Sequence, residues 1–186
     1  MSSETLFWGF YVLLFGLAIG SFLNVVILRG LSEESIVFPP SKCPKCNKPL
    51  KWYMNLPVIS YIFLRGKCAF CKKPISIQYP LVELTNAVLY ILMYLNFGLS
   101  FKTLFLCALS SLFVLIATTD LKERIVFDLH CWIMVALGVL YNILKLGNVS
   151  VLESVLGVLA GFLAFEIMAK FGTIIAKTRT FGEGGY

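Results

Sequence analysis

One stretch of 23 residues near the start of the chain limits what this sequence can fold into. Residues 6–28, LFWGFYVLLFGLAIGSFLNVVIL, contain no charged side chain. A helix of this length crosses the roughly 30 Å hydrocarbon layer of a bilayer, at about 1.5 Å per residue. The preceding MSSET has no basic residue, and no small-residue cleavage motif follows a short apolar core. We therefore predict a retained membrane anchor rather than a cleaved signal peptide.

The rest of the chain is of the same kind. Hydrophobic residues make up 59% of the 186 positions, and the mean hydropathy of +0.85 is far above that of a soluble domain. Four further apolar stretches are expected to span the bilayer, at about 81–98, 103–119, 129–144 and 151–169. The sequence predicts an all-α polytopic membrane protein with about five transmembrane helices.

The basic residues give the expected orientation, because cytoplasmic loops retain Lys and Arg. The segments 29–80, 120–128 and 170–186 hold nine, two and three basic residues, whereas the other loops hold only Lys102 and Lys145. This bias predicts an outside N-terminus and a cytoplasmic C-terminus. The net charge of +6 then reflects topology and attraction to anionic lipid, and no pattern of basic and aromatic residues indicates nucleic acid.

Four cysteines lie in the one long polar segment, as CPKC at 43–46 and CAFC at 68–71. Two C-x2-C pairs separated by 21 residues are able to place four sulfurs around one Zn²⁺. Two disulfides or four free thiols are the alternatives, and a reducing cytoplasmic location disfavours disulfides. We therefore expect a structural zinc-ribbon-like loop, with Cys43, Cys46, Cys68 and Cys71 as ligands and no open position for a catalytic water.

Carboxylates in apolar helices are costly, so each is a functional candidate. The five candidates are Glu83, Asp120, Asp128, Glu153 and Glu166. Three of them have explanations that need no function. Glu153 is expected near the outer end of its helix, where water solvates the carboxylate, and Glu166 is expected to pair with Lys170 one turn later. Asp128 is expected to cap the helix that follows it. Asp120 is expected at a helix C-terminus, where the helix dipole disfavours a negative charge. Two carboxylates that share a proton catalyse peptide hydrolysis, and Asp120 is the candidate for one of them.

Several ordered motifs resemble the bifunctional type IV prepilin peptidases, which are integral-membrane aspartic enzymes. The motifs are GSFLNVVILR at 20–29, FPPSKCPKC at 38–46, LKWYMNLPVISYIFLRGKC at 50–68 and CKKPISIQYPLVEL at 71–84. The resemblance covers most of residues 6–128. It implies cleavage of leader peptides from type IV prepilins or type II secretion pseudopilins at the cytoplasmic face of the bacterial inner membrane. It also implies methylation of the new N-terminus with S-adenosylmethionine.

The resemblance assigns roles to segments and residues. Residues 1–29 correspond to the first anchor, 30–80 to the zinc-binding segment associated with methylation, and 81–186 to an incomplete peptidase domain. Asp120 matches the first catalytic aspartate, and Glu83 matches the glutamate after YPLV as a methylation-site candidate. The family has a proline before the aspartate matched by Asp128, where this chain has Phe127.

The family's second catalytic aspartate lies in G-x-G-D, and GEGG at 182–185 places Gly185 at that position. We therefore expect the chain as written not to cleave prepilins. A natural truncation, an interrupted reading frame and a deliberately shortened chain all remain open. A non-catalytic, membrane-anchored zinc scaffold that binds pilins or assembly proteins is the alternative function. A small transporter subunit is a third, disfavoured because the two halves show no inverted repeat.

Overall fold

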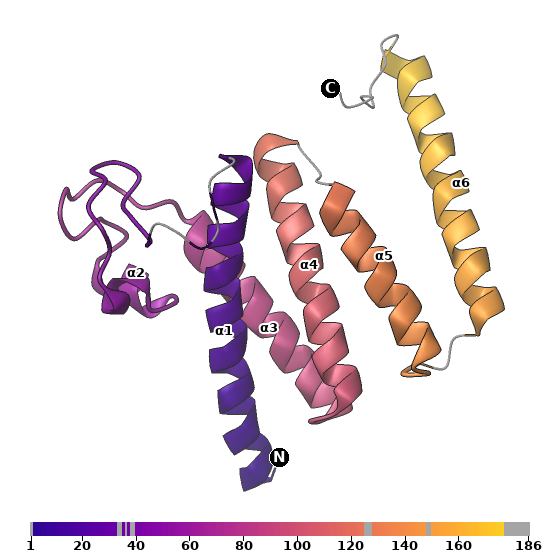
Figure 1. The fold of residues 1–186 in the computed structure, drawn as a ribbon, viewed down its shortest axis with the longest axis horizontal. Helices are drawn as coiled ribbons and strands as arrows, with labels where there is room; N and C mark the ends of the chain where they lie inside the picture. The colour runs from indigo at the N-terminus through magenta and orange to yellow at the C-terminus, as the bar shows by residue number, and fades with distance from the viewer. Residues whose placement is uncertain are drawn as a thin grey trace. The chain divides into compact units, whose positions relative to one another are not determined.

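A computed structural model describes residues 2–32, 35, 37, 40–124, 128–147 and 150–176, although several side chains of the last range are not described. The chain forms two units, Met1–Gly138 and Val139–Tyr186. All of the regular elements in the described residues are helical (Figure 1). In chain order they are α1 (Ser3–Leu31), η1 (Trp52–Asn55), α2 (Ile59–Phe63), α3 (Gln78–Phe97), α4 (Phe101–Glu123), α5 (Asp128–Ile143) and α6 (Val151–Ala176).

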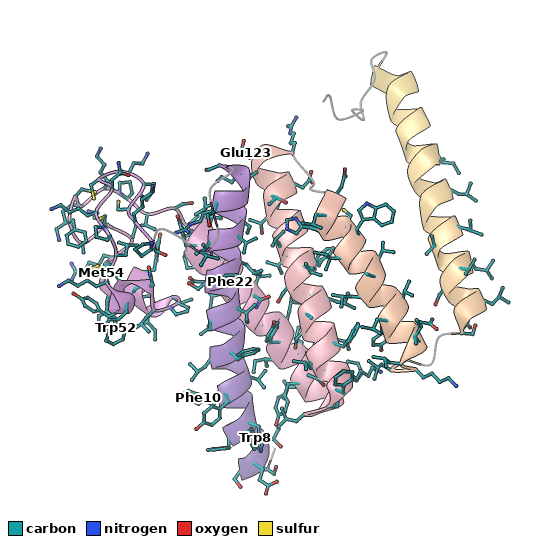
Figure 2. All side chains as sticks on the ribbon, viewed as in Figure 1. Trp8, Phe10, Phe22, Trp52, Met54 and Glu123 are labelled. Atoms are coloured by element: carbon teal, nitrogen blue, oxygen red, sulfur yellow. The ribbon has the colours of Figure 1, made fainter. Side chains whose placement is uncertain are left out.

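The prediction of about five transmembrane helices is confirmed in part. Among the described residues, α1, α3 and α4 are long and apolar enough to cross a membrane. The 16-residue α5 and the Leu152–Gly161 part of α6 form shorter apolar helices. Many large hydrophobic side chains of α1 face outward, including Trp8, Phe10 and Phe22 (Figure 2). Such a surface suits lipid, so the protein is a membrane protein with multiple apolar helices.

Local sequence explains where the long helices of the first unit begin. Ser2 and Ser100 precede α1 and α4, and each hydroxyl accepts a hydrogen bond from a backbone N–H three residues on. These are N-caps, which satisfy donors left free by helix geometry. Pro80 lies in the first turn of α3, where its missing N–H costs nothing.

The first unit is held together by the contact between α1 and α3. Gly16 and Gly20 lie one turn apart on α1, and both face the backbone of α3. A Cβ atom at Gly16 would lie 2.8 Å from the Cα of Ala87, and one at Gly20 would lie 2.7 Å from the Cα of Glu83. This Gly-x3-Gly arrangement allows two membrane helices to approach with their backbones nearly touching.

Buried polar side chains add hydrogen bonds where the helices meet. The Asn86 amide on α3 donates to the Gly16 carbonyl of α1 at 2.8 Å. The Ser111 hydroxyl on α4 donates to the other end of the same amide, the Asn86 Oδ1, at 2.9 Å. Asn86 has no exposed surface, and its amide therefore links three helices. The apolar core beside this network consists of Leu23, Ile27, Val82, Val114 and Leu115.

In the second unit, the end of α5 is followed by a turn and then α6. The Asn142 amide donates to the Ser154 hydroxyl at 2.6 Å. At the start of α6, the Ser150 backbone N–H donates to the Glu153 carboxylate, and the Glu153 N–H donates to the Ser150 hydroxyl. This capping box accounts for Glu153 without a catalytic role.

Introducing a side chain at position 16 tests the contact between α1 and α3. We expect Gly16→Leu to lower the free energy of unfolding by about 1–3 kcal/mol or more, because the helices must separate to admit the side chain. The midpoint of SDS-induced unfolding, followed by circular dichroism, measures this. Gly138→Leu is the matched control, since a Cβ at Gly138 meets nothing within 4 Å. Equal midpoints for the two variants would contradict the contact.

Candidate metal centre and acidic residues

The loop between α1 and α3 contains the same eight-residue pattern twice. KCPKCNKP at 42–49 and KCAFCKKP at 67–74 share Lys, Cys, Cys, Lys and Pro at equivalent positions, 25 residues apart. Each copy is closed by an isolated antiparallel bridge, Lys42 with Pro49 in the first and Lys67 with Pro74 in the second. We call these two segments the first and second knuckle.

The two knuckles have the same backbone hydrogen bonds. In the first, the Cys43 N–H donates to the Lys48 carbonyl at 3.0 Å, and the Asn47 N–H donates to the Cys43 carbonyl at 2.8 Å. In the second, the corresponding bonds are Cys68 to Lys73 at 2.9 Å and Lys72 to Cys68 at 3.0 Å. Asn47 and Lys72 both have a left-handed φ, 56° and 58°, which reverses the chain after the second cysteine. The repeated pattern therefore produces a repeated turn.

These turns bring all four predicted ligands together. The sulfurs of Cys43, Cys46, Cys68 and Cys71 lie within 4.8 Å of one another, and those of Cys43 and Cys71 are 4.0 Å apart. All four cysteines are free rather than disulfide-bonded. Tetrahedral zinc with Zn–S bonds of about 2.3 Å requires sulfurs about 3.8 Å apart. A small contraction of the cluster would meet that geometry, so the donor set and its spacing fit zinc.

The protein already favours a thiolate at one of these positions. The backbone N–H groups of Cys71 and Phe70 donate to the Cys68 sulfur and lower the pKa of this thiol to about 6. The Lys48 N–H lowers the pKa of Cys46, but burial and the nearby sulfurs of Cys43 and Cys71 outweigh it and raise that pKa to about 11. Metal binding must therefore displace a proton from Cys46, whereas Cys68 is ready to bind at neutral pH.

The structure places Glu83 in the second turn of α3, and only 6% of the residue is exposed. Its Oε2 accepts a hydrogen bond from the Val58 backbone N–H at 2.7 Å. Val58 has a φ of 58°, which is rare for a β-branched residue and must be held by its surroundings. Glu83 thus joins the cysteine-containing loop to the helices. Nothing in the sequence around Val58 indicated this bond.

A second buried polar side chain lies next to Glu83. Asn24 on α1 is 1% exposed and donates to the Tyr79 carbonyl at 3.0 Å, near the start of α3. It also reaches the carbonyl of Gly20, the glycine that packs on Glu83. Asn24 was not among the sequence-predicted site residues. The presence of an amide side chain within the uncharged membrane segment 6–28 was the signal that could have identified it.

Asp120 lies in the last turn of α4, and its side chain is exposed. The helix continues to Glu123, and the Arg124 N–H closes it by donating to the Asp120 carbonyl at 2.8 Å. Asp128 is the first residue of α5 and is also exposed. This location agrees with the predicted start of the helix, and the capping role of Asp128 stays a prediction. Phe127 and the GEGG segment with Gly185 lie outside the described residues, as does the side chain of Glu166.

Comparison with protein families matches both halves of the chain. Residues 14–97 match the bacterial peptidase A24 N-terminal domain, and residues 107–184 match the type IV leader peptidase family. The first range includes the four-cysteine cluster and Glu83, and the second includes Asp120 and Asp128. No solved structure matches the chain.

Curated relatives agree with this assignment. The chain is 37% identical to a prepilin leader peptidase/N-methyltransferase of Myxococcus xanthus over 94% of its own length, but it spans only 52% of that protein. It is 32% identical to the enzyme of that name from Neisseria gonorrhoeae, covering 92% of the chain and 68% of the relative. With the enzyme of that name from Klebsiella pneumoniae the identity is 35%, over 96% of the chain and 81% of the relative. Since the two domain models lie in order along one chain and the relatives share one name, this protein is a member of the type IV prepilin leader peptidase/N-methyltransferase family.

Proposed function

We propose that this chain acts in the processing of type IV prepilins or type II secretion pseudopilins at the bacterial inner membrane. The observation that carries the proposal is the 35% identity to the Klebsiella enzyme over 81% of that enzyme, together with the four-cysteine cluster. The family name combines two reactions, hydrolysis of a leader peptide and methylation of the exposed amine. In this proposal each part of the chain has its own role. The membrane anchor is residues 1–29, the metal-binding segment associated with methylation is residues 30–80, and the peptidase part is residues 81–186.

The proposed arrangement in the membrane has five spans, with α5 and α6 completing the three long helices. The N-terminus is outside, and the cysteine loop and Asp120 are on the cytoplasmic side. Fourteen of the sixteen basic residues support this orientation, because they fall in the segments assigned to the cytoplasm. Labelling of Cys43 by a membrane-impermeant reagent added to intact cells would contradict it.

The metal ion of the cluster is proposed to be Zn²⁺ in a structural role. Four sulfur ligands leave no position for a catalytic water, so the metal holds the two knuckles together. S-adenosylmethionine is the proposed methyl donor and supplies a methyl group on a sulfonium to the pilin amine. No residue is assigned to its binding.

We expect purified protein to contain about one Zn²⁺ per chain, measured by elemental analysis. Cys43→Ser should lower the occupancy and expose residues 40–77 to protease, because this segment folds around its metal. Acidification to about pH 5 should also release zinc, since protons compete for the sulfurs. Cys131→Ser is the matched control, as Cys131 is an exposed cysteine of α5 outside the cluster. Protease resistance without bound metal would contradict the assignment.

Asp120 is the proposed acid–base residue of leader cleavage. An aspartic mechanism needs two carboxylates, and the residue matched to the second is Gly185. We therefore expect no leader loss above background when the 186-residue chain in lipid vesicles is incubated with a prepilin and analysed by mass spectrometry. Robust cleavage that Asp120→Asn abolishes would show that another acid completes the site, with Asp128→Asn the next variant. Cleavage that survives Asp120→Asn would rule out Asp120.

Glu83 is proposed to act in methylation as a positioning residue, through the loop that it holds at Val58. Gln at position 83 keeps an oxygen that accepts the Val58 N–H, whereas Leu does not. We therefore expect Glu83→Gln to retain most methyl transfer to a mature pilin peptide, and Glu83→Leu to lose at least tenfold. If both variants lose methyl transfer while their zinc content and trypsin resistance stay unchanged, the reaction needs the negative charge of the Glu83 carboxylate instead.

The methyl-transfer assay also distinguishes the alternative function. Gly185 is the observation that favours a non-catalytic scaffold. Binding of a pilin peptide without methyl transfer or cleavage would support the scaffold, and methyl transfer would exclude it.

A further inference from the structure

The segment between the two knuckles exposes an unusual amount of apolar surface. Residues 51–66, which we call the aromatic hairpin, contain η1 and α2. The exposed fractions of Trp52, Ile62 and Phe63 are 78%, 66% and 83%. Tyr53, Leu56 and Ile59 are exposed as well. The packing of the first unit does not account for these side chains, because none of them belongs to its core.

The hydrogen bond to Glu83 sets the position of the aromatic hairpin along α1. Val58, at the centre of the hairpin, donates to Glu83, and the Glu83 backbone packs on Gly20 of α1. The uncharged membrane segment ends at Leu28, eight residues after Gly20. Eight residues of helix correspond to a distance of about 12 Å along the helix axis. Val58 therefore lies level with the membrane-spanning part of α1, to which it is linked through Glu83. In Figure 2, Trp52 and Met54 lie at about the level of Phe22 along α1, rather than beyond the helix end.

A segment at this depth must satisfy its own backbone, because hydrocarbon offers no hydrogen bonds. The backbone N–H groups of Met54, Ser60, Ile62, Leu64 and Gly66 donate to carbonyls within the hairpin at 2.9–3.0 Å. The Val58 N–H has the Glu83 carboxylate instead. The buried carboxylate thus satisfies a donor that would otherwise be left unpaired.

The charge around the aromatic hairpin indicates what it contacts. The sequence from residue 35 to residue 82 has no acidic residue and eight basic ones, six of them in the knuckles and two, Lys51 and Arg65, at the ends of the hairpin. Both of these side chains are exposed. Apolar and aromatic side chains between basic residues match the interface of a leaflet that contains anionic lipid.

We propose that the aromatic hairpin is inserted into the lipid leaflet on the side of the cysteine loop, with Lys51 and Arg65 at the anionic headgroups. Inserted in this way, the hairpin is a second membrane contact of the loop and holds the metal centre at the bilayer surface. This inference does not depend on catalysis, and it holds whether or not the chain processes pilins.

Tryptophan fluorescence tests the proposal directly, because the chain has three tryptophans, Trp8, Trp52 and Trp132. The variant Trp8→Phe/Trp132→Phe keeps Trp52 alone and changes two exposed side chains conservatively. In vesicles that contain anionic lipid, we expect lipids brominated near the headgroup to quench Trp52 strongly and aqueous iodide to quench it weakly. The matched control adds Trp52→Phe and Lys45→Trp, which places the only tryptophan on an exposed knuckle position and should reverse the two results.

The charged ends provide an independent measurement. In the variant that keeps Trp52 alone, the further substitutions Lys51→Gln and Arg65→Gln should reduce the quenching of Trp52 by brominated lipid in anionic vesicles. In vesicles of zwitterionic lipid, the same substitutions should change this quenching little. Strong iodide quenching of Trp52 in both kinds of vesicle would overturn the proposal. Iodide quenching that disappears when an apolar pilin peptide is added would also overturn it, by showing that the aromatic hairpin binds a protein rather than lipid.

Discussion

The close approach of α1 and α3 at Gly16 and Gly20 is the contact on which the rest of the first unit depends. Without side chains at these positions, the two backbones touch, and the Gly16 carbonyl comes within reach of Asn86. The same contact fixes the height of Glu83 relative to α1. Through Glu83, it also fixes where the loop meets the helices. In a bilayer, where apolar contact with lipid is as favourable as contact with protein, such backbone packing and hydrogen bonding supply the specificity.

The cysteine loop has a different source of order. Between residues 40 and 77, all of which the structure describes, the only buried side chains are Cys43 and Cys68. A segment with so little apolar burial cannot offset the entropy cost of ordering its chain. Four metal–sulfur bonds would supply what the missing core does not, which is the basis for proposing a structural role for the metal. The two equivalent knuckles give this loop a symmetry that the surrounding helices lack.

Glu83 shows how a residue singled out by resemblance acquires a physical role only in three dimensions. Its burial identifies it as costly, and the hydrogen bond to Val58 shows what offsets that cost. Glu153 gives the opposite result, since its capping box with Ser150 removes the need for a functional explanation. Both residues are carboxylates near the start of an apolar helix. Their burial and their partners distinguish them.

The sequence by itself determined the membrane class, the limits of most helices and the four cysteines that come together, because these depend on local features: long uncharged runs and short cysteine spacings. The expected spans at 81–98 and 103–119 lie within or close to α3 and α4. Tertiary structure alone decided the Gly16–Ala87 contact, the Val58–Glu83 bond and the level of the aromatic hairpin along α1. Each of these joins residues 25 or more positions apart, and neither hydrophobic periodicity nor motif spacing specifies which distant backbone group a side chain will meet.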